Sequence, residues 1–144
     1  MEQTIGNACG TIGLLHALAN TLEPAEWGSG VFKEIMHRTL SLSPAARAKE
    51  LELIKGLESI HQDQATQGQT EAPDAEEDVD LHFVCFVEKE GFLYELDGRN
   101  PTPINHGPCT DLALDAATVI KKIMALSPEQ VNYTILALAG DPDA

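Results

Sequence analysis

The fold is decided by residues 81–98, which read Leu-His-Phe-Val-Cys-Phe-Val-Glu-Lys-Glu-Gly-Phe-Leu-Tyr-Glu-Leu-Asp-Gly. Two runs rich in aromatic and β-branched residues, 81–87 and 92–97, flank a short polar turn, a pattern that predicts an antiparallel hairpin. If Glu88 faces Gly91 across this turn, His82 lies opposite Asp97 on the same face of the sheet. A slip of one residue would separate the two side chains. The hairpin therefore predicts an imidazole–carboxylate pair.

Helices are predicted on both sides of the hairpin, which gives a mixed α/β chain of the α+β type. Apolar residues recur at helical spacing in several segments. Ser29 is expected to cap one helix, and Ser43-Pro44 places a cap and a first-turn proline at the start of the next. The predicted helices are 8–21, 30–40, 44–61 and 111–126, followed by a strand at 131–139, with a loop at 100–108.

Residues 62–80 are polar and acidic, with almost no large apolar side chain. Such a segment cannot bury enough surface to order itself and is predicted to be a flexible loop. A loop of this length inside a compact domain is usually functional, although a neutral insertion is the alternative. The expected organisation is one domain over 1–140 containing this loop, and a frayed tail at 141–144.

Composition narrows the classes of protein. The chain has 144 residues and a formal charge of −14, which disfavours nucleic acid and favours a basic protein surface as partner. No run is apolar enough for a membrane span, and no signal peptide opens the chain. Three irregularly spaced cysteines do not describe a disulfide framework, so the expected compartment is the cytoplasm or the nucleus. The histidines lack the spacing of metal ligands.

Four residues supply the groups that a cysteine hydrolase needs. Cys9 lies between a turn and a predicted helix, whose N-terminus favours a thiolate. His82 would hold the thiol proton, Asp97 would orient His82, and the amide of Gln3 would donate to the oxyanion together with the Cys9 N–H. Taken singly, three of the four have an ordinary alternative: a buried thiol for Cys9, a core or rim histidine for His82 and a turn aspartate for Asp97.

Three separate motifs resemble those of the papain-like ubiquitin carboxyl-terminal hydrolases. Residues 3–17, Gln-Thr-Ile-Gly-Asn-Ala-Cys-Gly-Thr-Ile-Gly-Leu-Leu-His-Ala, are similar to the nucleophile motif of that family. Residues 68–73 and 79–83 resemble its crossover loop and catalytic histidine, and residues 93–99 and 103–107 resemble its aspartate motif. The likeness is greatest to the small cytosolic members that cleave ubiquitin adducts.

The resemblance implies a partial papain-like fold, with helices around an antiparallel sheet and a crossover loop at 62–80. It makes Cys9 the nucleophile, His82 the general acid/base, Asp97 its orienting partner and Gln3 the oxyanion donor. The implied reaction is hydrolysis after the C-terminal glycine of ubiquitin, with small or unfolded leaving groups and without metal or cofactor. Ubiquitin is the implied partner, and ubiquitin-like proteins are a second candidate; neither nucleic acid nor a membrane is expected.

Members of the family carry a substantial stretch of chain before the motif that contains Gln3. Here this motif begins only two residues after Met1, which is unusually close for the family. The expectation is therefore an N-terminally shortened catalytic domain whose core is marginal. Two hypotheses stay open: an active hydrolase that uses Cys9, or a catalytically silent fragment that retains at most weak ubiquitin binding. A cysteine peptidase acting on other tails is a third reading.

Overall fold

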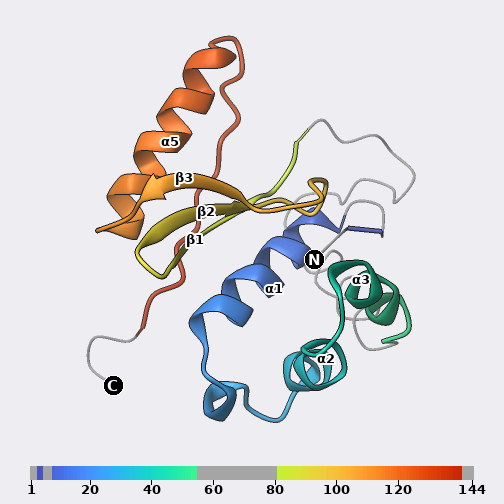
Figure 1. Ribbon diagram of the computed structural model, residues 1–144. Helices are drawn as coiled ribbons and strands as arrows, with labels where there is room; N and C mark the ends of the chain where they lie inside the picture. The colour runs from blue at the N-terminus through green and yellow to red at the C-terminus, as the bar shows by residue number, and fades with distance from the viewer. Residues whose placement is uncertain (1–2, 5–7, 55–80, 141–144) are drawn as a thin grey trace. The chain divides into compact units, whose positions relative to one another are not determined.

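The structure is a computed structural model that describes residues 3–4, 8–54 and 81–140 (Figure 1). The chain divides into two compact units. The first comprises residues 1–85 and 96–103, and the second comprises residues 86–95 and 104–144. The predicted loop at 62–80 and the predicted tail at 141–144 lie outside the described residues.

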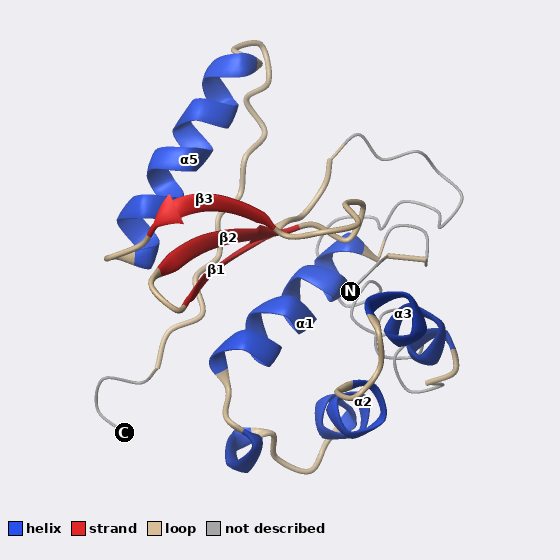
Figure 2. Cartoon of the chain, in the orientation of Figure 1, coloured by secondary structure: helices blue, strands red, loops and turns tan. Residues whose placement is uncertain are grey.

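The first unit contains helices that the apolar spacing predicts. The described helices are α1 (Cys9–Thr21), the short 3-10 helix η1 (Pro24–Glu26), α2 (Val31–Thr39) and α3 (Pro44–Glu52) (Figure 2). The three α-helices share one hydrophobic core, formed by Ile12, Leu15, Ile35, Leu51 and Ile54. Burial of such side chains stabilises each by ~1.5–3 kcal/mol, so this core fixes α1 against α2 and α3.

The two predicted helix starts have different outcomes. Ser43 caps α3 as expected, because its side chain accepts a hydrogen bond from the Ala46 N–H at 3.4 Å and Pro44 follows it. Ser29 does not cap α2. The cap residue is Gly30, whose extended backbone takes that position without a side-chain hydrogen bond.

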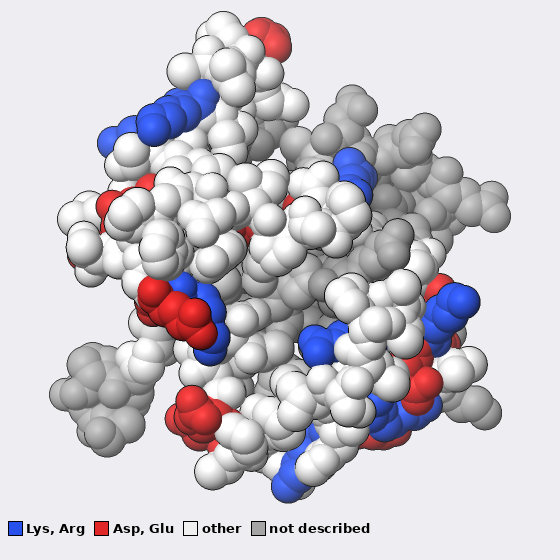
Figure 3. All heavy atoms as spheres, viewed as in Figure 1, with Lys and Arg blue, Asp and Glu red and all other residues white. Residues whose placement is uncertain are grey.

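The third helix ends earlier than the apolar pattern suggests. α3 ends at Glu52 with Leu53 as its C-cap, and Leu53 is 65% exposed. The rest of that predicted helix, 55–61, lies outside the described residues. Arg38 joins α2 to α3 by donating from Nε to the Glu50 carboxylate at 2.7 Å. Acidic and basic side chains accordingly lie side by side over these helices (Figure 3).

The second unit is built on an antiparallel sheet. Strands β1 (Cys85–Lys89), β2 (Phe92–Leu96) and β3 (Ile104–Pro108) lie in the order β1-β2-β3. The prediction of a loop at 100–108 is therefore wrong over its second half. The prolines and glycine there suggested a loop, but β3 is hydrogen-bonded only to β2 among the described strands, and proline is tolerated in strands at sheet edges.

One helix covers this sheet. α5 (Leu112–Leu126) matches the predicted helix, and Asp111 caps it by accepting from the Leu114 N–H at 3.0 Å. Ala116 and Val119 pack with Leu93 of β2, whereas Ile123, which follows Val119 at helical spacing, is 40% exposed. Figure 1 shows α5 beside β3.

The last predicted strand does not form. Residues 131–139 have no strand structure, and their large apolar side chains are exposed: Val131, Tyr133, Ile135, Leu136 and Leu138. A strand requires hydrogen-bonded neighbours, and no described strand pairs with this segment. Within the described residues, no helix is both long and apolar enough to cross a lipid bilayer.

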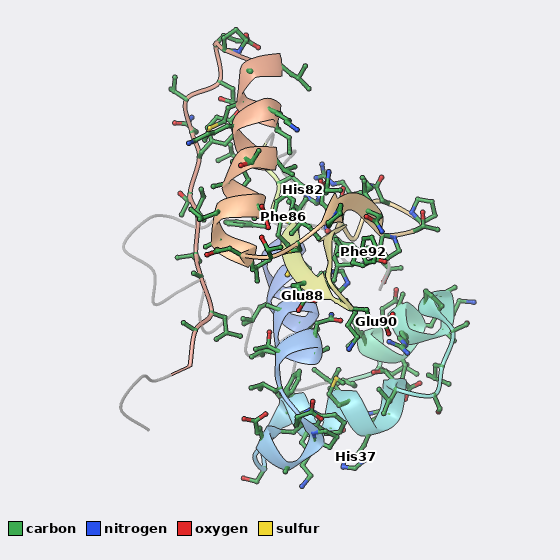
Figure 4. The ribbon with its side chains drawn as sticks, turned by 60° about the vertical axis from the view of Figure 1, so that its left-hand side comes forward. His37, His82, Phe86, Glu88, Glu90 and Phe92 are labelled. Atoms are coloured by element: carbon green, nitrogen blue, oxygen red, sulfur yellow. The ribbon has the colours of Figure 1, made fainter. Side chains whose placement is uncertain are left out.

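The hairpin forms, but its turn is offset from the prediction. Glu90 and Gly91 have φ of 53° and 81°, and these two residues alone separate β1 from β2 (Figure 4). A two-residue turn with both φ positive aligns Lys89 with Phe92, not Glu88 with Gly91. The predicted pairing is wrong by two residues. Because side chains alternate with a period of two, every residue still keeps its predicted face.

Candidate active site

Cys9 is the first residue of α1. The N-cap residue Ala8 supplies no side-chain hydrogen bond, and the first turn of α1 holds no acidic residue. The leading N–H groups of a helix lack intrahelical partners and carry the positive end of its dipole, which favours an anion there. Cys9 occupies this position at the start of α1 and is partly exposed.

The other two thiols are in different environments. Cys85 is buried, and this burial raises its pKa to about 11. Burial also raises the pKa of Cys109, and the nearby carboxylate of Asp115 raises it further. Both groups therefore remain thiols at neutral pH. Because the thiolate is the nucleophilic form, Cys9 is the cysteine whose setting suits nucleophilic chemistry.

His82 and Asp97 meet, as the sequence predicts. His82 Nε2 lies 2.6 Å from Asp97 Oδ1, and the two side chains are 16% and 12% exposed. The ionised carboxylate accepts the proton on Nε2, which leaves the lone pair of a neutral imidazole on Nδ1. Nδ1 is buried and has no hydrogen-bond partner among the described residues. In this tautomer, Nδ1 is the ring nitrogen that can accept a proton from another group.

The contact is not a ladder pair of the hairpin. β1 begins at Cys85 and β2 ends at Leu96, so His82 and Asp97 lie just beyond the two strand ends. Figure 4 shows His82 on the segment that leads into β1. The hairpin brings the two segments together, and the final approach is made by the chain outside the sheet.

A tight turn holds Asp97 in place. The Asn100 N–H donates to the Asp97 carbonyl at 3.2 Å, and the Arg99 N–H donates to Asp97 Oδ1 at 2.8 Å. Burial acts to raise the pKa of Asp97, but the Arg99 N–H and His82 outweigh it, so the pKa of Asp97 lies below its usual value. The carboxylate is therefore ionised at neutral pH and cannot rotate away from His82 without losing the Arg99 bond.

Gln3 is anchored to the same turn. Its backbone N–H donates to the Gly98 carbonyl at 2.8 Å. α1 also approaches these segments: a Cβ atom at Gly10, next to Cys9, would lie 3.7 Å from the ring of Phe83, next to His82. The structure thus brings together His82 with Asp97, Gln3 with Gly98, and the start of α1 with the residue after His82.

The residues that support this site are not evident from the sequence. Gly98 and Arg99 act through their main chains, which residue type does not reveal. The available signal was the Asp-Gly dipeptide at 97–98, which is typical of a tight turn. No group of three or more histidine, cysteine, aspartate or glutamate side chains among the described residues is arranged to hold a metal ion.

The lowered pKa of Asp97 predicts a stability change in acid. A carboxyl group whose pKa is depressed by folding stabilises the fold above its unfolded pKa of ~3.9, and this contribution is lost as the pH falls through the folded pKa. We expect Asp97→Asn to reduce the free energy of unfolding at pH 7 and to have less effect near pH 3. Urea titrations of both chains at the two pH values measure this. An equal loss at both would contradict it.

Comparison with known proteins identifies the family. The model of the ubiquitin carboxyl-terminal hydrolases, family 1, matches residues 1–125, and the chain belongs to this family. A probable ubiquitin carboxyl-terminal hydrolase of Dictyostelium discoideum is 41% identical over 99% of the chain and 57% of its own length. A ubiquitin carboxyl-terminal hydrolase of Drosophila melanogaster is 44% identical over 97% of the chain and 62% of its own length.

A solved structure shares the fold. The Trichinella spiralis UCH37 catalytic domain, crystallised with bound ubiquitin vinyl methyl ester, superposes with a TM-score of 0.72 at 25% identity. The match covers 91% of this chain and 58% of that one. The mixed helical and antiparallel fold expected from the sequence is confirmed. The chain spans about three fifths of the length of the curated relatives it matches.

Proposed function

We propose that this chain is a cysteine-dependent hydrolase that cleaves thiol-ester, amide or isopeptide bonds after the C-terminal glycine of ubiquitin. The observation that carries the proposal is the His82–Asp97 contact of 2.6 Å, with Nδ1 of His82 left without a partner among the described residues. Membership of the ubiquitin carboxyl-terminal hydrolases supports it. So does the setting of Cys9 at the start of α1.

In the proposed reaction, His82 Nδ1 takes the proton of Cys9, and the sulfur attacks the carbonyl carbon of the terminal glycine. The side-chain amide of Gln3 and the backbone N–H of Cys9 stabilise the oxyanion, each worth ~10²–10³ in rate. The bond to the leaving group breaks as His82 returns the proton to it. Water, deprotonated by His82, then attacks the thioester, and ubiquitin and the free Cys9 thiol are released.

The finer features of the function are also part of the proposal. We propose small adducts or unfolded tails as the preferred leaving groups, as the resemblance of residues 68–73 to the crossover loop of the family implies. The charge of −14 favours a basic surface near the tail of ubiquitin or of a ubiquitin-like protein. None of the three cysteines, all of which lie in the described parts of the chain, is in a disulfide, which suits the reducing environment of the cytoplasm or nucleus.

The test uses ubiquitin vinyl methyl ester, whose vinyl group adds to a thiolate. We expect the full chain to gain the mass of one ubiquitin, with the modification mapped by peptide mass spectrometry to Cys9. Ubiquitin with a free carboxyl terminus, added in excess, should slow the labelling by competing for the same surface. If folded, soluble chain forms no adduct, the hydrolase proposal is rejected, and the silent fragment with weak ubiquitin binding takes its place.

A further inference from the structure

One turn supports two parts of the proposed site. In the turn 97–100, the side chain of Asp97 contacts His82, the proposed base. The carbonyl oxygen of Gly98, the next residue, accepts the N–H of Gln3 at 2.8 Å. The residue that orients the proposed base, Asp97, is therefore followed directly by the residue that binds the main chain of the proposed oxyanion donor.

Position 98 requires glycine because there is no room for a side chain, and not because of its backbone conformation. Gly98 is buried and its φ is outside the left-handed region, so other residues could adopt its backbone. A Cβ atom there would lie 2.8 Å from the Cβ of Gln3 and 3.1 Å from Cγ2 of Ile12. A separation of 2.8 Å is shorter than real Cβ atoms show, so a side chain at position 98 displaces a neighbour.

Of the two neighbours, Gln3 is the one that would move. Ile12 belongs to α1 and is 4% exposed in the hydrophobic core with Leu15 and Ile35. Displacing it would disturb close-packed side chains on three helices, which resist small changes of volume. Gln3 precedes α1, is only half-buried, and is tied to the turn by a main-chain hydrogen bond.

We propose that Gly98 is a positioning residue that sets the place of Gln3 beside the turn that orients His82, through its carbonyl oxygen and its lack of a side chain. The inference rests on the proposed role of Gln3 in the reaction. A methyl group at position 98 pushes Gln3 away while the Asp97 side chain keeps its bonds to His82 and to the Arg99 N–H. The base is then intact and the oxyanion donor is misplaced.

Kinetics of Gly98→Ala, Gln3→Ala and the double variant test whether a methyl group at position 98 impairs the oxyanion donor and leaves the base intact. We expect each single variant to lower kcat for a fluorogenic ubiquitin amide by ~10²–10³, the loss typical of one oxyanion donor. The double variant should be no slower than Gln3→Ala within about threefold, because both changes remove the same donor. The rate of Cys9 alkylation by iodoacetamide and its pH profile should be retained. Losses that multiply, or a changed alkylation profile, would overturn the proposal.

The matched control is Gly13→Ala, which adds the same methyl group to α1. A Cβ atom at Gly13 meets no described heavy atom within 4 Å. Alanine there should stabilise the helix and leave kcat unchanged. This control separates an effect of the space at position 98 from a general effect of glycine replacement in the same unit.

Hydrogen exchange of the Gln3 amide tests the inference independently of catalysis. In the wild-type chain this N–H is bound to the Gly98 carbonyl and should exchange slowly, whereas in Gly98→Ala it should exchange at least about tenfold faster. An unprotected Gln3 amide in the wild type, or equal protection in Gly98→Ala, would sink the inference. A chain that shows this pattern without any turnover would refute the proposed function alone. If Gly98→Ala does not fold, protection of Gln3 in the wild type decides the question.

Discussion

The Cys9→Ala chain is expected to lose both ubiquitin hydrolysis and labelling by ubiquitin vinyl methyl ester. No other described thiol can replace this nucleophile. Burial raises the pKa of Cys85 to about 11, so at pH 7 only about one molecule in 10⁴ carries a thiolate there. Cys109 is buried beside Asp115, whose charge also opposes ionisation. The loss of kcat should be large, since removing the nucleophile of a serine protease costs on the order of 10⁶-fold.

Cys85→Ala and Cys109→Ala are the matched controls. Both should keep the turnover of the wild-type chain per folded molecule, because neither thiol contributes to the proposed reaction. Iodoacetamide at pH 7, followed by peptide mass spectrometry, should modify Cys9 before either of the others. Modification of Cys85 or Cys109 at the rate of Cys9 in folded protein would contradict the assignment of the nucleophile.

The second large effect is expected at Asp97. Asp97→Ala removes the acceptor for His82 Nε2 and for the Arg99 N–H. The orientation and the tautomer of the imidazole are then no longer fixed. We expect kcat/KM to fall by ~10²–10⁴, the range of a positioned general base. Asp97→Asn should lose less, because its carbonyl oxygen can accept both hydrogen bonds and only the charge is removed. The ratio of the two variants measures how much of the effect is orientation.

The chain contains a matched control for this experiment. His106 Nε2 lies 2.8 Å from Glu95 Oε2, which is a second histidine–carboxylate pair outside the proposed site. Glu95→Ala removes that carboxylate in the same way and should leave kcat/KM unchanged. Steady-state kinetics of the three variants between pH 5 and 9 compare them directly. If Glu95→Ala is as damaging as Asp97→Ala, the loss reflects general destabilisation and not the His82–Asp97 pair.

The sequence predicts well the features that repeat or that depend on local chemistry. Apolar spacing predicts the extent of α1 and the helix α5, and the capping residue Ser43 predicts the start of α3. The hairpin pattern predicts that His82 and Asp97 meet. The hairpin brings the two segments together in spite of the offset of its turn, and the chain beyond the strand ends completes the His82–Asp97 contact. The four roles at the proposed site are assigned from residue type and stay predictions.

The features that depend on distant partners could not be predicted. β3 forms because β2 lies beside it, although its proline and glycine residues are typical of a loop. Residues 131–139 are apolar enough for a strand but have no described strand beside them. The hydrogen bond between Gln3 and Gly98 joins main-chain atoms far apart along the chain, and no side-chain pattern encodes it.

The turn at 97–100 also limits how this region can change during evolution. Surface turns generally accept inserted residues, because few contacts depend on their length. Here the Asp97 side chain binds His82 and the Gly98 carbonyl binds Gln3. An extra residue between Asp97 and Gly98 would change the distance between these two contacts. We therefore expect natural variation in length to occur elsewhere among the loops, and this turn to keep its four residues in any descendant that retains the reaction.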